Sequence, residues 1–208
     1  MTDADNPVIG LRPGQVMQKR LFDVLFSLIG LLATSWLIVL AWLAASIDTR
    51  SNGFFTQERV GKDGRIFRVI KIRTMREVPG LNSTVTTGSD VRITRLGRFW
   101  RRSKIDELPQ LINILKGDMS FVGPRPDVPG YADRLQGDDR IILSVRPGIT
   151  GPATLKYRNE EYLLAEKNDP QKYNDQVLWP DKVRLNREYV EKWSFIKDLR
   201  YIWMTVIE

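Results

Sequence analysis

No charged residue occurs between Val24 and Ile47, and most positions in this stretch are Leu, Ile, Val, Ala, Phe or Trp. A straight helix of that length reaches roughly 36 Å, enough to cross a hydrocarbon core of roughly 30 Å. A cleavable signal peptide fits poorly, because the stretch is too long and the acidic residues Asp3 and Asp5 precede it. The apolar character runs all round the helix, which disfavours a buried core helix. The sequence therefore predicts a membrane segment.

Basic residues flank this stretch on both sides. Arg12, Lys19 and Arg20 precede it, and five more follow it, at Arg50, Arg59, Lys62, Arg65 and Arg68. Positive residues favour the cytoplasmic side of a membrane, and one straight span cannot place both flanks there. A re-entrant helix can, with a break at Thr34 and Ser35, whose hydroxyls can bond carbonyls of the preceding turn. A plain spanning helix remains the alternative.

Composition restricts the chemistry that the chain can perform. The 208 residues carry a net charge of +7 and contain neither cysteine nor histidine. The charge predicts an anionic partner: nucleic acid, lipid headgroups or a phosphorylated small molecule. The missing residues exclude disulfides, thiolate and histidine metal sites, and a catalytic triad built on histidine. Any chemistry must therefore rest on carboxylates, Lys, Arg, hydroxyls or an oxygen-bound cation such as Mg²⁺.

The remaining segments predict a mostly helical domain with one small hairpin. Residues 54–75 alternate like two strands around a turn at Gly61-Lys62-Asp63-Gly64, and the polar residues 78–90 are typical of a loop. Residues 157–190 favour helices interrupted at Asp169-Pro170 and Trp179-Pro180. The aromatic-rich stretch 189–207 fits either a helix lying at the membrane surface or one packed on the domain core.

A basic run leads into the segment most typical of a reactive site. Between residues 91 and 105 there are six basic residues and no acid: Arg92, Arg95, Arg98, Arg101, Arg102 and Lys104. Asp106 and Glu107 follow, and Leu108, Leu111, Ile112 and Leu115 recur at helical spacing. Because Pro109 is tolerated only in a first turn, the predicted helix begins at Asp106 or Glu107 and ends at Lys116-Gly117.

That helix start predicts the chemistry of Asp106. The helix N-terminus is expected to keep the Asp106 carboxylate ionised and also to attract phosphate. An ordinary N-cap aspartate is the simpler interpretation of the residue alone. An ionised carboxylate beside arginines is, however, the arrangement that nucleophilic attack on phosphorus needs.

Two rigid turns carry further arginines. Arg125 lies between Pro124 and Pro126, and Arg146 begins the turn Arg146-Pro147-Gly148. Restricted backbone reduces the entropy lost when a guanidinium binds a phosphate. Both arginines are therefore candidate substrate-binding residues.

Together these motifs resemble the bacterial sugar transferase family, the small monotopic phosphoglycosyl transferases. The likeness runs from about Lys19 to Arg158. Its elements, in order, are Lys19-Arg20-Leu21-Phe22-Asp23, Gln57-Glu58-Arg59-Val60-Gly61, Lys71-Ile72-Arg73-Thr74-Met75, Thr94-Arg95-Leu96-Gly97-Arg98, Asp106-Glu107-Leu108-Pro109-Gln110, the stretch from Met119 to Pro126, and the stretch from Arg146 to Gly151.

The resemblance implies a monotopic membrane protein, mostly α with a small β-hairpin. The implied parts are an N-terminal tail (1–18), a re-entrant membrane helix (19–50) and a catalytic domain (51–208) with interfacial amphipathic helices, including one at the C-terminus. The implied location is the cytoplasmic face of the bacterial inner membrane, in contact with lipid. Whether the protein forms a homodimer stays open.

The resemblance also implies a two-step reaction. Asp106 attacks the β-phosphate of a UDP-sugar and releases UMP, and a polyprenyl phosphate, undecaprenyl phosphate by analogy, then takes the phosphosugar. Glu107 supports Asp106 in binding Mg²⁺ or activating the acceptor. Phosphate-binding positions match Arg101, Arg125 and Arg158, with Lys71 and Arg73 nearby. Nucleic acid is not an expected partner. Which sugar is carried, and which carboxylate ligates the metal, stay open.

Two departures from the family pattern and two rival functions remain. Trp36 follows Ser35 where the family usually has proline. Thr154-Leu155 replaces the Gln-Val that the family often has at these positions, in a part of the chain that the resemblance links to the choice of sugar. A membrane-tethered binding protein would also explain the charge, but not the Asp106-Glu107 pair or the framing of Arg125. A scaffold that recruits later glycan enzymes would need no catalytic carboxylate.

Overall fold

The computed structural model describes residues 10–78 and 90–207, and most of these residues are helical. The N-terminal half contains α1 (Pro13–Thr49), β1 (Phe54–Val60), β2 (Ile66–Ile72), α2 (Arg95–Ser103), α3 (Gln110–Lys116) and β3 (Ser120–Val122). The C-terminal half contains β4 (Gly148–Thr150), α4 (Pro152–Lys156), α5 (Glu160–Ala165), α6 (Pro170–Tyr173), α7 (Trp179–Glu191) and α8 (Phe195–Ile207). The short helical turns are η1 (Lys62–Gly64), η2 (Ile105–Glu107), η3 (Ala132–Arg134), η4 (Gly137–Ser144) and η5 (Asn174–Leu178).

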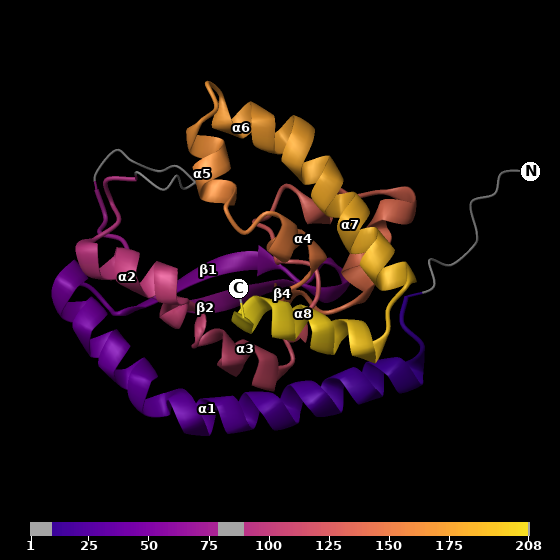
Figure 1. The fold of residues 1–208 in the computed structure, drawn as a ribbon, viewed down its shortest axis with the longest axis horizontal. Helices are drawn as coiled ribbons and strands as arrows, with labels where there is room; N and C mark the ends of the chain where they lie inside the picture. The colour runs from indigo at the N-terminus through magenta and orange to yellow at the C-terminus, as the bar shows by residue number, and fades with distance from the viewer. Residues whose placement is uncertain (1–9, 79–89, 208) are drawn as a thin grey trace, which may run out of the picture.

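Helix α1 is one continuous helix that changes direction part-way along its length, with its concave side toward the rest of the protein (Figure 1). Thr34 Oγ1 donates to the Gly30 carbonyl at 2.7 Å, and Ser35 Oγ donates to the Leu32 carbonyl at 3.3 Å. Such bonds to the preceding turn are a common cause of bending. The predicted hydroxyl contacts are confirmed, but the helix bends without a break. Trp36 explains this, because it keeps the backbone N–H that a proline would lack.

The two faces of α1 have different surroundings. Ala41 and Ala45 are 0% and 1% exposed, because they pack against Ile72 of β2. The opposite face leaves large apolar side chains exposed, at Met17, Leu21, Leu25, Phe26, Leu28, Ile29, Leu32, Trp36, Val39, Leu40, Leu43 and Ile47. Only 17% of the most apolar 18-residue window is buried, and by length and composition the helix can cross a membrane. A helix of the protein core is therefore excluded, and α1 is compatible with a monotopic membrane protein.

Both ends of α1 dock on the same body of the protein. Near the N-terminal end, Lys19 pairs with Asp198 of α8, and Arg20 donates both terminal nitrogens to carbonyls at the end of α3. Near the C-terminal end, Trp42 Nε1 donates to Asn52 Oδ1 at 3.2 Å and its ring stacks on Phe54. Lys19 and Arg20, which the sequence analysis counted among the basic residues that favour the cytoplasmic side, bond groups of the protein itself. The predicted domain boundary at residue 19 also falls within α1, which begins at Pro13.

The predicted hairpin is confirmed. Strands β1 and β2 pair antiparallel from Phe54↔Ile72 to Val60↔Ile66. The turn between them places Asp63 and Gly64 at φ 57° and 77°, a region that glycine adopts without strain. In the view of Figure 1 this hairpin lies between α1 on one side and α5 and α6 on the other. The predicted loop over 78–90 lies outside the described residues except at its two ends.

A second, parallel strand pair has no counterpart in the sequence prediction. β3 and β4 pair at Ser120↔Gly148 and Val122↔Thr150. Each strand is three residues long, too short for a period-two pattern to identify. Close approach of the two chains requires glycine, since a Cβ on Gly148 would lie 2.1 Å from the backbone nitrogen of Gly123.

The helix after Asp106 differs from the prediction at its start and agrees at its end. Asp106 and Glu107 form the 3₁₀ turn η2, and α3 begins only at Gln110, after Pro109. Proline donates no hydrogen bond, so the ladder of α3 starts beyond it. Gly117 ends α3 with φ 94°, as predicted for a glycine C-cap.

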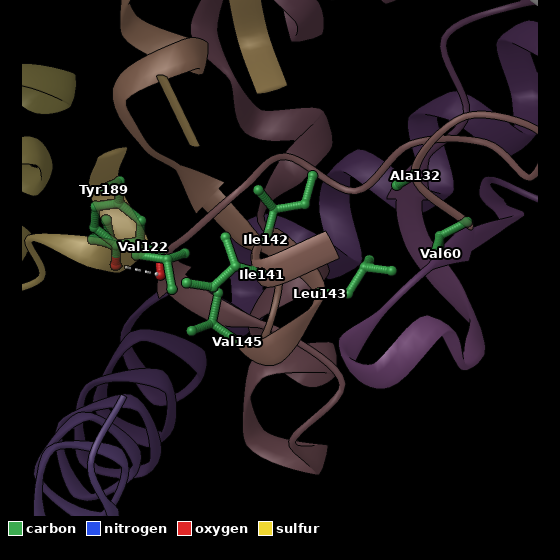
Figure 2. Packing of buried hydrophobic residues seen from close by; sticks show 9 residues of the cluster. Val60, Val122, Ala132, Ile141, Ile142, Leu143, Val145 and Tyr189 are labelled. Atoms are coloured by element: carbon green, nitrogen blue, oxygen red, sulfur yellow. Dashed lines mark hydrogen bonds between the residues drawn. The ribbon is translucent and has the colours of Figure 1, made fainter. Parts of the chain in front are cut away.

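The main core joins the middle of the chain to its C-terminal helices. Figure 2 shows Ile141, Ile142, Leu143 and Val145 of η4 and its flank grouped with Val122, and the Tyr189 hydroxyl oxygen lies 3.4 Å from the Val122 carbonyl oxygen. This cluster fixes β3, and with it the segment that leads to Arg125.

The C-terminal region tests the two predicted helix interruptions and the two interpretations of the last helix. A new helix begins at Pro170 after Asp169, as predicted, but at Trp179-Pro180 the chain stays helical through the π-turn η5. A wider i→i+5 turn accommodates a proline that lacks its N–H. Helix α8 packs Tyr201 and Ile202 on the core and leaves a second face exposed, at Ile196, Leu199, Trp203, Val206 and Ile207. Core packing is thus shown for one face, and the other remains available to a membrane surface.

Candidate active site

Asp106 lies in a tight turn between two helices. Thr94 caps α2 by accepting from the Gly97 N–H at 2.8 Å, and α2 ends before Lys104, which has φ 58°. The chain then enters η2, where Asp106 is only 7% exposed. Its Oδ1 atom is buried and has no hydrogen-bond partner among the described residues. An unpaired buried carboxylate oxygen costs stability and is a reason to suspect a function.

Burial and, to a lesser extent, the neighbouring Glu107 carboxylate raise the pKa of Asp106 to about 6. Lys71, Arg101 and Lys104 act in the opposite direction. The expected helix N-terminus at Asp106 was wrong, because α3 begins only at Gln110, but a pKa of about 6 still leaves most of the carboxylate ionised at neutral pH. Desolvation outweighs the helix dipole here, because Asp106 precedes α3 and is enclosed by protein.

Glu107 joins three parts of the chain at the site. Its Oε1 accepts from Lys71 Nζ of β2 at 2.9 Å and from Arg125 Nη2 at 2.9 Å. Burial raises the pKa of Glu107, but Lys71 and Arg125 outweigh that effect and hold it well below its usual range. Glu107 is therefore a fixed negative charge that aligns two cations beside Asp106.

Arg125 is the more accessible of these cations. Its side chain is 45% exposed, and Glu107 raises its pKa. The structure thus pairs Arg125 with a carboxylate of the site rather than with a surface carboxylate. One face of the guanidinium stays open to solvent, so an anion can reach it while Glu107 holds its direction.

Sequence reasoning treated Arg59 only as part of a motif and a basic flank, and did not single out Asp127. Arg59 Nη1 donates to the Pro126 carbonyl at 3.1 Å, which ties β1 to the loop bearing Arg125. Burial and the charge of Arg125 lower the pKa of Arg59 to about 10. Burial raises the pKa of Asp127 to about 6. The motif around Arg59 was the available signal, but nothing in it indicated a contact with residue 126.

The remaining predicted residues divide into two groups. Arg101 acts electrostatically on Asp106 and forms an ion pair with Glu161 of α5. Arg146 Nε donates to the Gly117 carbonyl at 2.7 Å, at the end of α3 farthest from Asp106. Arg73 donates to the carbonyl of Asn52, and Arg158 donates to that of Met204 in α8.

The structure therefore brings Asp106, Glu107, Lys71, Arg125 and Arg101 together. The contacts of Arg146 and Arg73 instead join backbone segments. The predicted membrane-break residues Thr34 and Ser35 lie within α1 and donate to carbonyls of the preceding turn. Substrate binding by Arg73, Arg146 and Arg158 stays a prediction.

Comparison with known proteins decides the family. The profile described as bacterial sugar transferase matches residues 14–208. The chain belongs to the bacterial sugar transferase family. It is an enzyme of the phosphoglycosyl transferase class, as the resemblance predicted.

Three relatives illustrate the range of this family. The chain is 36% identical over 188 residues to the uncharacterized sugar transferase EpsL of Bacillus subtilis, covering 90% of this chain and 85% of EpsL. It is 36% identical over 199 residues to an undecaprenyl-phosphate glucose phosphotransferase of Komagataeibacter xylinus, covering 92% of this chain and 35% of that protein. It is 32% identical over 218 residues to a UDP-glucose:undecaprenyl-phosphate glucose-1-phosphate transferase of Caulobacter vibrioides, covering 96% and 74%. The sugar transferase described here thus matches both short relatives and part of longer ones.

Proposed function

We propose that the protein transfers a phosphosugar from a UDP-sugar to undecaprenyl phosphate through a covalent intermediate on Asp106. The observation that carries this proposal is the buried Asp106 carboxylate, whose Oδ1 has no hydrogen-bond partner among the described residues. It lies beside Glu107, which Lys71 and Arg125 hold. The activities for which the Komagataeibacter and Caulobacter relatives are named supply the donor and acceptor classes.

In the first step a carboxylate oxygen of Asp106 attacks the β-phosphorus of the donor. A new bond forms between that oxygen and phosphorus, and the bond from phosphorus to the bridging oxygen breaks. UMP leaves with the bridging oxygen, and the phosphosugar stays on Asp106 as an acyl phosphate. With a pKa of about 6, roughly nine in ten Asp106 side chains are ionised at neutral pH, so the nucleophile is available.

The cations around Asp106 bind and orient the donor diphosphate. The Arg125 side chain is 45% exposed, so its guanidinium can reach the donor. The Lys71 side chain is 24% exposed, and its Nζ pairs with Glu107. Arg101 forms an ion pair with Glu161 of α5, so it must release the Glu161 carboxylate before it can bind a donor phosphate. Positioned cations of this kind stabilise the charge that develops on the phosphoryl oxygens.

The two carboxylates fit a Mg²⁺ ion that binds together with the donor. No group of three or more acidic side chains suited to a metal occurs among the described residues. Mg²⁺ is commonly held by one or two carboxylates, substrate phosphates and water, and the unpaired Oδ1 of Asp106 suits that mode. When bound, Mg²⁺ would offset the charge of the diphosphate. Asp106 and Glu107 are the residues that would hold it.

In the second step the acceptor phosphate takes the phosphosugar. An oxygen of undecaprenyl phosphate attacks the phosphorus of the intermediate, and the bond to Asp106 breaks to regenerate the carboxylate. The products of both steps are UMP and an undecaprenyl diphosphosugar, which balances the atoms of donor and acceptor. Formation of such a lipid-linked sugar would begin the assembly of an exopolysaccharide or another surface glycan.

The shape of α1 supports a re-entrant membrane topology. Its convex face is apolar and exposed, while Lys19 near one end and Trp42 near the other contact the same body. A straight span would separate these ends by a bilayer. We therefore place the body on one face of the membrane, the cytoplasmic face of the inner membrane, where UDP-sugars are made.

The proposal is tested by incubating detergent-purified protein with Mg²⁺, undecaprenyl phosphate and a panel of UDP-sugars. We expect one donor to yield UMP and a lipid-linked phosphosugar in equal amounts, and Asp106→Asn to abolish both. The control is Asp63→Asn, an exposed turn residue with φ 57°, which should retain activity. A folded wild type that yields neither product with any donor would overturn the proposal in favour of a binding or scaffold role.

A further inference from the structure

Asn113 of α3 occupies the free edge of the hairpin. Strand β1 pairs with one edge of β2, and the carboxamide of Asn113 covers the other. Its Oδ1 accepts from the Ile70 N–H at 3.0 Å, and its Nδ2 donates to the Arg68 carbonyl at 2.8 Å. One acceptor and one donor, two residues apart along the strand, reproduce what a neighbouring strand would supply.

The same residue is fixed within its own helix. The carbonyl of Asn113 accepts from the Gly117 N–H at 3.1 Å and from the Asp118 N–H at 3.0 Å, which closes the end of α3. Asn113 is 1% exposed, so these bonds are made away from water. Hydrogen bonds at both its side chain and its backbone fix the position of α3 along β2.

This position decides which side chains meet at the candidate site. Lys71 follows Ile70 on β2, and Glu107 precedes α3, so their 2.9 Å contact depends on how the two elements are aligned. A slip of α3 by one residue would move it by roughly 1.5 Å along its axis, enough to break such a bond.

We propose that Asn113 is a positioning residue for the transfer reaction, which sets α3 against β2 so that Lys71 meets Glu107 beside Asp106. The inference rests on the proposed function, because it assigns Asn113 a role in the same site. Asn113 does not touch the reacting atoms in this scheme, and it acts through Lys71 and Glu107.

A double-mutant cycle of Asn113→Ala and Lys71→Met, measured on kcat, separates the positioning of Lys71 against Glu107 from a general loss of structure. Asn113→Ala should lower kcat by about tenfold or more in the wild-type background, with a smaller change in KM for the donor. In a Lys71→Met background the same substitution should lower kcat by less than about threefold, since the contact is already lost. If Asn113→Ala lowers kcat by the same factor in the wild-type and Lys71→Met backgrounds, the proposal is overturned.

A matched control distinguishes this effect from the loss of any buried asparagine. Asn186 of α7 is 4% exposed, and its Oδ1 has no hydrogen-bond partner among the described residues. Asn186→Ala should leave kcat within about twofold of wild type. Hydrogen exchange provides the fold check, because Asn113→Ala should speed exchange of the Ile70 amide while β1–β2 pairing persists.

A readout that does not need turnover separates this inference from the proposed function. If the wild type makes no product, the proposed function fails, and the contact between Lys71 Nζ and Glu107 Oε1 then tests the positioning. A crystal structure of Asn113→Ala should show this 2.9 Å contact lengthened beyond hydrogen-bond distance. An unchanged contact between Lys71 and Glu107 would overturn the role of Asn113.

Discussion

Lys19 Nζ lies 2.5 Å from Oδ2 of Asp198, and the two side chains are 9% and 4% exposed. Tyr189 and Trp193 also donate to the Asp198 carboxylate, at 2.7 and 3.1 Å. The pair joins the start of α1 to α8, so the two helices with exposed apolar faces are held in one arrangement. A buried, fully bonded ion pair is costly to break from one side only.

We therefore predict that Asp198→Leu destabilises the protein by about 3–5 kcal/mol, because it leaves the Lys19 ammonium buried without a partner. Thermal and denaturant unfolding in detergent measure the effect. The double variant Lys19→Met with Asp198→Leu should recover part of the loss. A double variant as unstable as the sum of both single variants would contradict this account.

Replacing Asp106 should stabilise the protein at neutral pH. The folded pKa of about 6 exceeds the unfolded value of 3.8, so the folded state binds the proton more tightly. The cost of ionised Asp106 therefore appears as pH rises from 3.8 to 6, and is fully present above 6, at up to about 3 kcal/mol. Asp106→Asn removes that cost, and unfolding at pH 8 and pH 4 should show a gain only at pH 8. An equal effect at both pH values would contradict the raised pKa.

The rate of phosphosugar transfer should fall in acid with the protonation of Asp106. We expect a tenfold loss per pH unit well below a midpoint near 6, because only the ionised carboxylate attacks phosphorus. Glu107→Gln removes a charge that raises the pKa of Asp106, so the midpoint should move to lower pH even as the maximal rate falls. The pH dependence of kcat/KM for the donor, which reports the free enzyme, tests this, and a midpoint unmoved in Glu107→Gln would argue against Asp106 as the titrating group.

The re-entrant topology predicts that both ends of α1 lie on one side of the membrane. Because the chain has no cysteine, single variants Arg12→Cys and Arg50→Cys can be labelled with an impermeant thiol reagent. Both should react in inverted membrane vesicles and neither in right-side-out vesicles, with the cysteine-free parent as control. Labelling from opposite sides would establish a spanning helix instead.

Short motifs singled out residues that the structure brings together, because these residues are close in sequence or share a known pattern. Asp106-Glu107 and the proline-framed Arg125 were found this way, and the structure brings them together with Lys71. The raised pKa of Asp106 could not be predicted, because burial depends on segments far away in the chain. The hairpin followed from strand periodicity and turn glycines.

Contacts between side chains and distant backbone escaped prediction. Arg20 reads as a membrane flank and Arg146 as a phosphate-binding residue, yet both bond the carbonyls at the end of α3. Asn113 carries no sequence signal at all for its contact with β2, 43 positions away from Ile70. No periodicity encodes such pairs, because each depends on how whole elements pack.

Intact-protein mass spectrometry tests the central claim most directly. Wild-type protein, Asp106→Asn and the control Asp63→Asn are each incubated with Mg²⁺ and UDP-sugars, without acceptor, and quenched rapidly. The account predicts a phosphosugar adduct on wild type and Asp63→Asn only, with matching UMP, and loss of the adduct when undecaprenyl phosphate is added. UMP release without an adduct, or an adduct that persists on Asp106→Asn, would contradict it.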